Sequence, residues 1–199
     1  MRVGYRARDI VHPIWLRVTH WINAAAIIFM IGSGWTIYNA SLLFPFVFPV
    51  GIAHWLPGAL LVHFAAMWLL VVTGLIYLAL GIANGRFRRK LFPIRFSDVL
   101  RDAQAAFRGM LKHEDLSVYN AVQRLLYVSV IIASLVAVLS GISIWKPVQF
   151  QELTAVFGGY DAARFVHFFA MAAITGFLVV HVALALVVPK SLRAMTLGR

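Results

Sequence analysis

The chain has 199 residues, of which 62% are hydrophobic and 13% are charged, about half of the charged fraction of a soluble domain. This composition is that of a membrane protein. Cysteine is absent, which excludes thiolate-held iron–sulfur clusters, zinc–thiolate sites, disulfides and covalently attached c-type haem. Any redox chemistry therefore depends on a cofactor that histidine holds.

The net charge of +11 would suit nucleic acid, but its distribution favours a membrane. Basic residues precede the first apolar run, separate the second from the third, and follow the fourth. They are Arg2, Arg6, Arg8, Arg17, Arg86, Arg88, Arg89, Lys90, Arg95, Arg101, Arg108, Lys112, Arg124, Lys190, Arg193 and Arg199. Only Lys146 and Arg164 fall elsewhere. This positive-inside asymmetry predicts both termini in the cytoplasm, lipid as a partner and no nucleic-acid partner.

Four apolar runs are each long enough to cross a bilayer as a helix. We expect spans at about residues 14–38, 56–83, 119–144 and 164–188, with a cytoplasmic segment at 84–116. The first run lacks a small-residue cleavage site and precedes further spans, so we expect a retained helix and not a signal peptide. The predicted fold is all-α: a single integral membrane four-helix bundle, with no repeat beyond the four apolar runs.

The cytoplasmic segment contains one helical pattern. Ser97 is positioned to cap a helix with one apolar face, formed by Val99, Leu100, Ala103, Phe107, Met110 and Leu111. Such a helix would lie on the inner membrane surface. A solvated loop with one helical turn explains the pattern equally well.

Histidines inside the apolar runs are the candidate functional residues, because ionisable groups at that depth are costly and usually functional. His20 lies in the first run, His63 in the second, and His167 and His181 in the fourth. The last two are separated by fourteen positions, which is about 21 Å along a helix and about 40° around it. Successive spans run in opposite directions. Only His20 with His181, at the inner side, and His63 with His167, at the outer side, then share a depth.

Two histidines on facing helices at one depth can supply both axial ligands of a b-type haem. The four histidines therefore predict two haem b groups stacked across the membrane. A single intramembrane histidine could instead form a hydrogen bond between helices, but four at matched depths is a more specific pattern. No carboxylate or cysteine accompanies the pairs to complete another kind of metal site.

Basic residues flank two of these histidines. Arg17 lies three positions before His20, and Arg164 three before His167, so each shares a helix face with its histidine. Each arginine would point toward its own membrane surface, where haem propionates need a cation. Positive-inside placement or contacts with lipid headgroups explain both arginines as well.

Glycines fall at the predicted levels of the two haems. Gly34 and Gly74 lie on nearly the same helix faces as His20 and His63, each at the depth of the other haem, and Gly176 lies between the histidines of the last run. Glycine at such positions lets a flat macrocycle approach the backbone, although small residues also serve helix packing.

The remaining histidines fall outside the membrane interior. We expect His54 at the outer interface, on the helix face opposite His63, and His12 and His113 in solvated cytoplasmic segments.

The sequence resembles the membrane-embedded di-haem cytochrome b superfamily, and the resemblance extends over essentially the whole chain. That group includes the cytochrome b subunits of nickel–iron hydrogenases, formate dehydrogenase gamma subunits, thiosulfate-reductase cytochromes and bacterial b561-type cytochromes. The matching stretches are Arg17-Val18-Thr19-His20-Trp21-Ile22-Asn23, His63-Phe64, Gly74-Leu75-Ile76-Tyr77, Tyr119-Asn120-Ala121-Val122-Gln123-Arg124, Arg164-Phe165-Val166-His167 and His181.

The resemblance implies a multi-pass protein of the bacterial cytoplasmic membrane that exchanges electrons between quinone and a peripheral redox subunit. It assigns one haem to His20 and His181 and the other to His63 and His167. It implies a quinone site near the inner haem with an asparagine at Asn120, and Gln123 is a plausible second contact. A helix cap explains both residues nearly as well.

The combination of Ser140-Gly141 with Trp145-Lys146-Pro147 and then Gly158-Gly159-Tyr160-Asp161 resembles relatives that serve a periplasmic molybdopterin oxidoreductase. A stand-alone cytochrome that oxidises superoxide or a quinol is the alternative function. A histidine-based transporter is a third, and it would be colourless. No residue of the sequence is assigned a catalytic role.

Overall fold

The computed structural model describes residues 12–49, 51–108 and 118–198. Within them, eight α-helices and no strands form, which confirms the predicted all-α class. The helices are α1 (Ile14–Ala40), α2 (Leu56–Ala83), α3 (Arg86–Leu91), α4 (Phe96–Phe107), α5 (Ala121–Trp145), α6 (Gln151–Val156), α7 (Tyr160–Val187) and α8 (Pro189–Leu197).

Helices α1, α2, α5 and α7 are long and apolar enough to cross a membrane. They lie over the four expected spans, except that α7 begins earlier than expected, at Tyr160. Gly158 and Gly159 precede it with φ values of 86° and 100°, a backbone conformation that favours glycine, so α6 turns tightly into α7.

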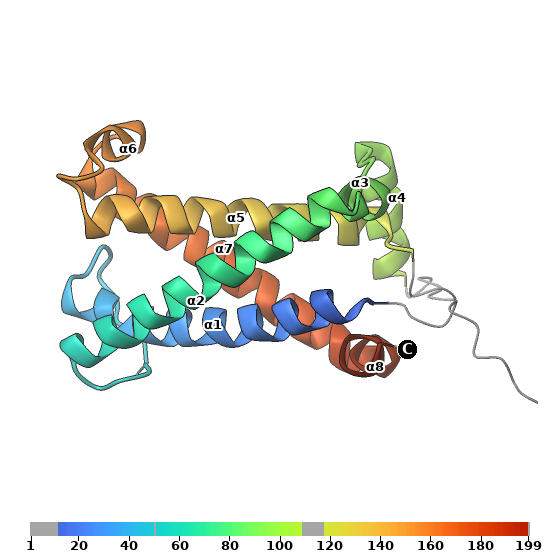
Figure 1. Ribbon diagram of the computed structural model, residues 1–199, viewed down its shortest axis with the longest axis horizontal. Coiled ribbons are helices and arrows are strands. Elements are labelled where there is room, and N and C mark those ends of the chain that lie inside the picture. The colour runs from blue at the N-terminus through green and yellow to red at the C-terminus, as the bar shows by residue number, and fades with distance from the viewer. Residues whose placement is uncertain (1–11, 50, 109–117, 199) are drawn as a thin grey trace, which may run out of the picture.

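The four long helices form two hairpins. Helix α1 packs along α2 (the first hairpin), and α5 packs along α7 (the second hairpin), whereas direct backbone contact between the hairpins is slight in the described part of the chain. Figure 1 shows segment 41–55 and α6 at one end of the bundle, which we call the loop end. Helices α3, α4 and α8 lie at the other end, which we call the basic end.

Side-chain size follows the packing. The residues buried within the hairpins are small, with Ala59, Ala163, Ser33 and Ser140 fully enclosed. Large apolar side chains face outward instead, and Leu61 is 71% exposed. Small residues let membrane helices approach closely, while the apolar exterior suits lipid chains.

Helix α4 confirms the helical interpretation of the segment after α2, but one detail was wrong. Ser97 lies inside the first turn and is not the cap, because the carbonyl of Arg95 already accepts hydrogen bonds from the amides of Asp98 and Val99. The expected apolar positions Met110 and Leu111 lie outside the described residues.

Candidate functional site

The four intramembrane histidines form two facing pairs, and each pair joins the two hairpins. The ring centroids of His20 on α1 and His181 on α7 lie 6.0 Å apart near the basic end. Those of His63 on α2 and His167 on α7 lie 6.4 Å apart near the loop end. The structure therefore brings together the histidines that the sequence paired by depth.

The loop-end pair is held by buried serines of the neighbouring helices. The hydroxyl of Ser33 lies 3.1 Å from Nδ1 of His63, and that of Ser140 lies 3.2 Å from Nδ1 of His167. The Nδ1 atom of His167 also lies 2.9 Å from the carbonyl oxygen of Ala137. Because a carbonyl only accepts, Nδ1 carries the hydrogen, and Nε2 keeps its lone pair for a metal.

These contacts reveal a repeat that inspection of the sequence missed. Ser33 is the twentieth residue of α1, and Ser140 is the twentieth of α5. His63 and His167 are each the eighth residue of their helices, α2 and α7. The two hairpins thus supply the loop-end site with the same serine–histidine unit. The expectation of no repeat beyond the four apolar runs was therefore wrong. Only two polar positions match between the hairpins, and so few matches are hard to recognise among many apolar residues.

A glycine follows each of these serines and lies against the paired histidine. A methyl group at Gly34 would stand 3.6 Å from Cε1 of His63, and one at Gly141 would stand 3.1 Å from Cε1 of His167. Gly34 therefore lies at the level expected for it. Gly141 is a second close approach, which the sequence reasoning had noted only as part of a family motif.

The basic-end pair breaks this symmetry. His20 is the seventh residue of α1, and the seventh residue of α5 is Tyr127. His181 is the twenty-second residue of α7, and the twenty-second of α2 is Tyr77. Tyrosines thus stand where the repeat would place a second histidine pair. The ring of Tyr127 lies 6.5 Å from that of His181.

Both pairs fit a metal held between two imidazoles. Rings bonded through Nε2 to opposite sides of one metal atom, at about 2 Å each, have centroids roughly 6 Å apart. Within the described residues, no group of three or more His, Cys, Asp or Glu side chains is placed to hold a metal. Each site therefore offers two protein ligands only, which leaves the remaining coordination positions to a macrocycle such as haem.

Comparison with known proteins agrees with this geometry. A family model described as prokaryotic cytochrome b561 matches residues 11–198. The chain belongs to this family. It is also 50% identical, over 190 residues, to a protein of Azospira oryzae named putative protein-methionine-sulfoxide reductase subunit YedZ1, a match that covers 94% of this chain and 96% of the relative. The chain is therefore a multi-pass membrane cytochrome b of the bacterial inner membrane, whose family implies haem b.

The two residues expected to contact quinone, Asn120 and Gln123, have a structural role at the start of α5. In α5, Asn120 and Gln123 form a capping box: Asn120 Oδ1 accepts from the Gln123 amide at 2.8 Å, and Gln123 Oε1 accepts from the Asn120 amide at 3.1 Å. The helix-cap alternative for both residues is therefore confirmed. Whether they also contact quinone stays a prediction.

The two arginines expected at haem propionates tie the ends of the hairpins together. Arg17 donates to the carbonyl oxygen of Thr196 in α8 at 2.6 Å. Arg164 donates to the carbonyl and hydroxyl oxygens of Ser41, which follows α1, at 2.6 and 2.9 Å. The Nε atom of Arg17 is buried and has no partner among the described residues, so they leave this donor available for a carboxylate.

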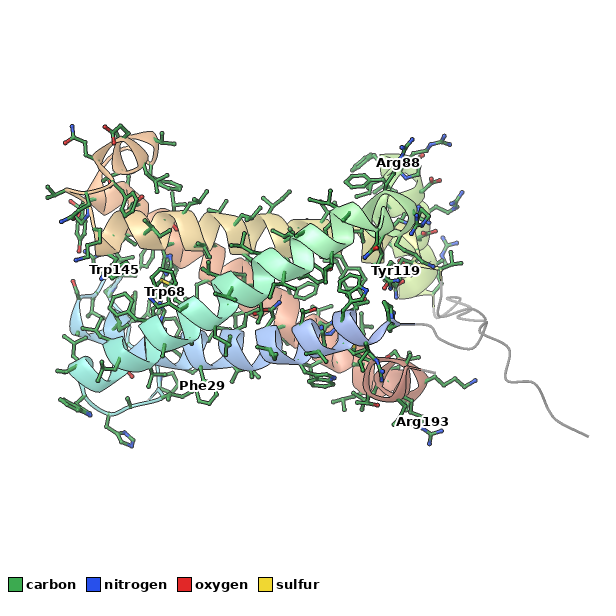
Figure 2. All side chains as sticks on the ribbon, in the orientation of Figure 1. Phe29, Trp68, Arg88, Tyr119, Trp145 and Arg193 are labelled. Carbon is green, nitrogen blue, oxygen red and sulfur yellow. The ribbon has the colours of Figure 1, made fainter. Side chains whose placement is uncertain are left out.

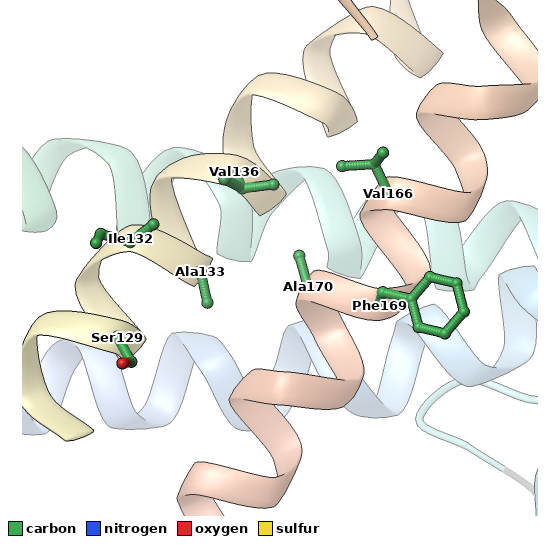
Figure 3. A pocket seen from close by; sticks show the side chains of 7 residues that line it. All are labelled: Ser129, Ile132, Ala133, Val136, Val166, Phe169 and Ala170. Atoms are coloured by element: carbon green, nitrogen blue, oxygen red, sulfur yellow. The ribbon is translucent and has the colours of Figure 1, made fainter. Parts of the chain in front are cut away.

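Gly74 and Gly176, the other two glycines named in the sequence analysis, do not lie against a histidine as Gly34 does. A methyl group at Gly74 would meet no atom within 4 Å, so this part of α2 is open. Gly176 lines a groove between α5 and α7 together with Ser129, Ala133 and Phe177. A second groove, of about 430 Å³, is also lined by Ser129 and Ala133. Figure 3 shows this second groove on the side of α5 and α7 that faces away from α1 and α2. Gly176 lies against neither histidine pair, so the structure gives no support to the expectation that it faces a haem.

The remaining histidines have separate environments. His54 is exposed beside the start of α2, as expected. His12 is 8% exposed and was wrongly expected to be solvated, because α3 folds back over it and Arg86 donates to its Nδ1 at 3.1 Å. His113 lies outside the described residues.

Proposed function

We propose that this protein is a di-haem b-type cytochrome that transfers electrons between the quinone pool and a peripheral redox subunit in a respiratory chain. The observation that carries the proposal is the presence of two facing histidine pairs near opposite ends of one bundle. His20 and His181 would hold one haem, and His63 and His167 the other. Helix α7 contributes to both sites and so fixes their separation.

The positive-inside rule supports an orientation with the basic end in the cytoplasm. Helices α3 and α8 carry cationic residues at this end, namely Arg86, Arg88, Arg89, Lys90, Lys190 and Arg193. The loop end carries Lys146 and Arg164 beside Glu152 and Asp161. His20 and His181 would then lie near the inner side and His63 and His167 near the outer side.

When bound, haem b supplies one-electron exchange at its iron. The chain itself performs no bond chemistry in this mechanism. Ser33, Ser140 and the Ala137 carbonyl orient the imidazoles of the outer pair and maintain the protonation that leaves Nε2 free. The apolar hairpins exclude water from both sites, so electrons would pass between the two sites and not to acceptors dissolved in water.

Quinone exchange is proposed near the inner pair, with Asn120 and Gln123 as contacts. The capping box at these residues needs a test that separates two roles. Asn120→Ser keeps an N-cap side chain, whereas Asn120→Ala removes it at a cost of about 1 kcal/mol. If Asn120 contacts quinone, both variants slow haem reduction by a quinol. Normal kinetics in Asn120→Ser would discard the quinone role.

A redox subunit, proposed to be a molybdopterin oxidoreductase, would bind at the outer loop end. Exposed apolar side chains there include Val148 (80% exposed), which precedes α6, and Val156 (79% exposed), the last residue of α6. The printed name of the Azospira relative, a reductase subunit, supports assembly with a catalytic partner. Electron exchange of the purified complex is then expected to stop when α6 residues are replaced by charged ones.

The decisive experiment is a reduced-minus-oxidised spectrum with haem quantitation on the purified chain. Two low-spin b haems per chain are expected. A chain that purifies folded but free of haem would overturn the proposal and favour the transporter. Steady turnover of a quinol or superoxide by the purified chain alone would favour the stand-alone alternative.

A further inference from the structure

A cationic side chain lies over the basic end of the bundle without an acidic partner among the described residues. Arg86 opens α3, which follows a turn at Gly85 and packs against α5. Its guanidinium donates to Nδ1 of His12 at 3.1 Å, and its positive charge lies close enough to Tyr119 to lower the pKa of that phenol against the effect of burial. The ion pairs that join two described residues all involve Arg101.

Neither neighbour neutralises Arg86. Burial and the charge of Arg86 lower the pKa of His12 to about 4, so His12 is neutral at pH 7 and accepts a hydrogen bond. Burial raises the pKa of Tyr119, so its hydroxyl remains protonated. A protonated phenol can donate its hydrogen to an acceptor. The three side chains together (the Arg86 cluster) form a site with one positive charge and one free hydroxyl donor.

The Arg86 cluster lies beside the inner histidine pair. The ring of Tyr119 is 5.1 Å from that of Tyr127, which is 6.5 Å from that of His181. On the other side, His12 lies just before α1, the helix that carries His20. Figure 2 places Tyr119 at the end of the bundle where α3 and α4 meet α5. The cluster is therefore separated from His181 by one side chain, that of Tyr127.

We propose that Arg86 and Tyr119 bind a propionate carboxylate of the haem that His20 and His181 hold. This inference rests on the proposed function. An ionised carboxylate at the edge of an apolar bundle is strongly destabilising unless it is paired, and arginine matches carboxylate geometry with two parallel donors. The cluster supplies that pairing from α3 and the start of α5, independently of Arg17 on α1.

The test is a redox titration of purified Arg86→Gln, with Arg88→Gln as the matched control. Arg88 lies on the same short helix but is exposed, so its removal changes the net charge equally. A positive charge beside the propionate favours the reduced haem. Arg86→Gln is therefore expected to weaken reduction of the inner haem roughly tenfold, about 59 mV for a one-electron couple. The outer haem should stay unchanged, as should both haems in Arg88→Gln.

To assign the shift to one haem, each substitution is also combined with His63→Ala, a variant in which only the inner haem is expected. Arg86→Lys keeps the positive charge, so the potential of the inner haem should stay close to that of the unsubstituted chain. Tyr119→Phe should lower this potential by less than Arg86→Gln does. Tyr119→Phe also serves if Arg86→Gln does not accumulate. An inner haem whose potential is unchanged in both Arg86→Gln and Tyr119→Phe overturns the inference, as does an equal shift in Arg88→Gln.

Failure of the inference can be distinguished from failure of the proposed function. Fewer than two haems in the unsubstituted chain would overturn the proposed function and this inference with it. Two haems, with potentials that do not respond to the Arg86 cluster, would overturn only the inference.

Discussion

Ser33 and Ser140 occupy the same position in α1 and α5, and each hydroxyl lies 3.1–3.2 Å from Nδ1 of the histidine on the other helix of its hairpin. Both serines are fully buried, and each also donates to a carbonyl of its own helix, Ser33 to Phe29 and Ser140 to Val136. The loop-end site is therefore built from two halves that share this serine–histidine contact. Equal substitutions in the two halves should have equal effects.

The first prediction concerns these serines. Ser33→Ala and Ser140→Ala should each lower haem affinity at the outer site by about 10–100-fold, because groups that orient a metal-ligating histidine have effects of this size. The measurement is haem retention under dilution or competition, with optical assignment of each haem. Ser143→Ala is the control, since Ser143 is equally buried in α5 but donates only to Leu139. Retention as high as in this control would contradict a role for the hydroxyls.

The second prediction concerns the ligands themselves. His63→Ala and His167→Ala should each leave one haem per chain, because the inner pair does not include either residue. Haem quantitation and redox titration of each variant provide the measurement. His54→Ala should retain both haems because its side chain is exposed at the loop end. Loss of the inner haem instead would show that the pairing is wrong.

The third prediction uses two glycines with opposite surroundings. Gly141→Ala adds a methyl group 3.1 Å from His167, so the imidazole must shift and the outer haem should change its spectrum or lose affinity. Gly176→Ala meets no atom within 4 Å and should leave both haems unaltered. Electron paramagnetic resonance of the oxidised protein would detect the altered ligand geometry. Equal spectra for the two variants would argue against a haem at His167.

The fourth prediction concerns the ends of the hairpins. Arg164→Ala removes two hydrogen bonds to Ser41 and should lower the free energy of unfolding by about 1–3 kcal/mol. Thermal unfolding in detergent measures the change. Arg193→Ala is the control, because the side chain of Arg193 is exposed on α8 (Figure 2). An equal melting temperature for both variants would mean that the Arg164 contact does not hold the hairpins together.

The sequence predicted the all-α class, the four apolar helices and the pairing of the histidines, because membrane thickness and alternating direction restrict which residues can meet. It did not reveal the contacts of Ser33 and Ser140, since buried serines are common packing residues in membrane helices and only the fold shows which one faces a histidine. Arg17 and Arg164 were assigned from their helix faces alone. Their hydrogen bonds to Thr196 and Ser41 depend on how the chain returns from distant segments, which no local spacing encodes.

The slight direct contact between the two hairpins also bears on how the protein is assembled. Each hairpin buries its own small residues, so the two can enter the membrane and fold one after the other. Between them, the described chain offers the histidine pairs, the polar contacts at the ends, and aromatic contacts near the loop end such as Tyr38 with Phe168 and Phe64 with Trp145. If both histidine pairs hold haem, each haem would stabilise the joined state and not the separated one. A shortage of haem would then weaken the association of the two hairpins.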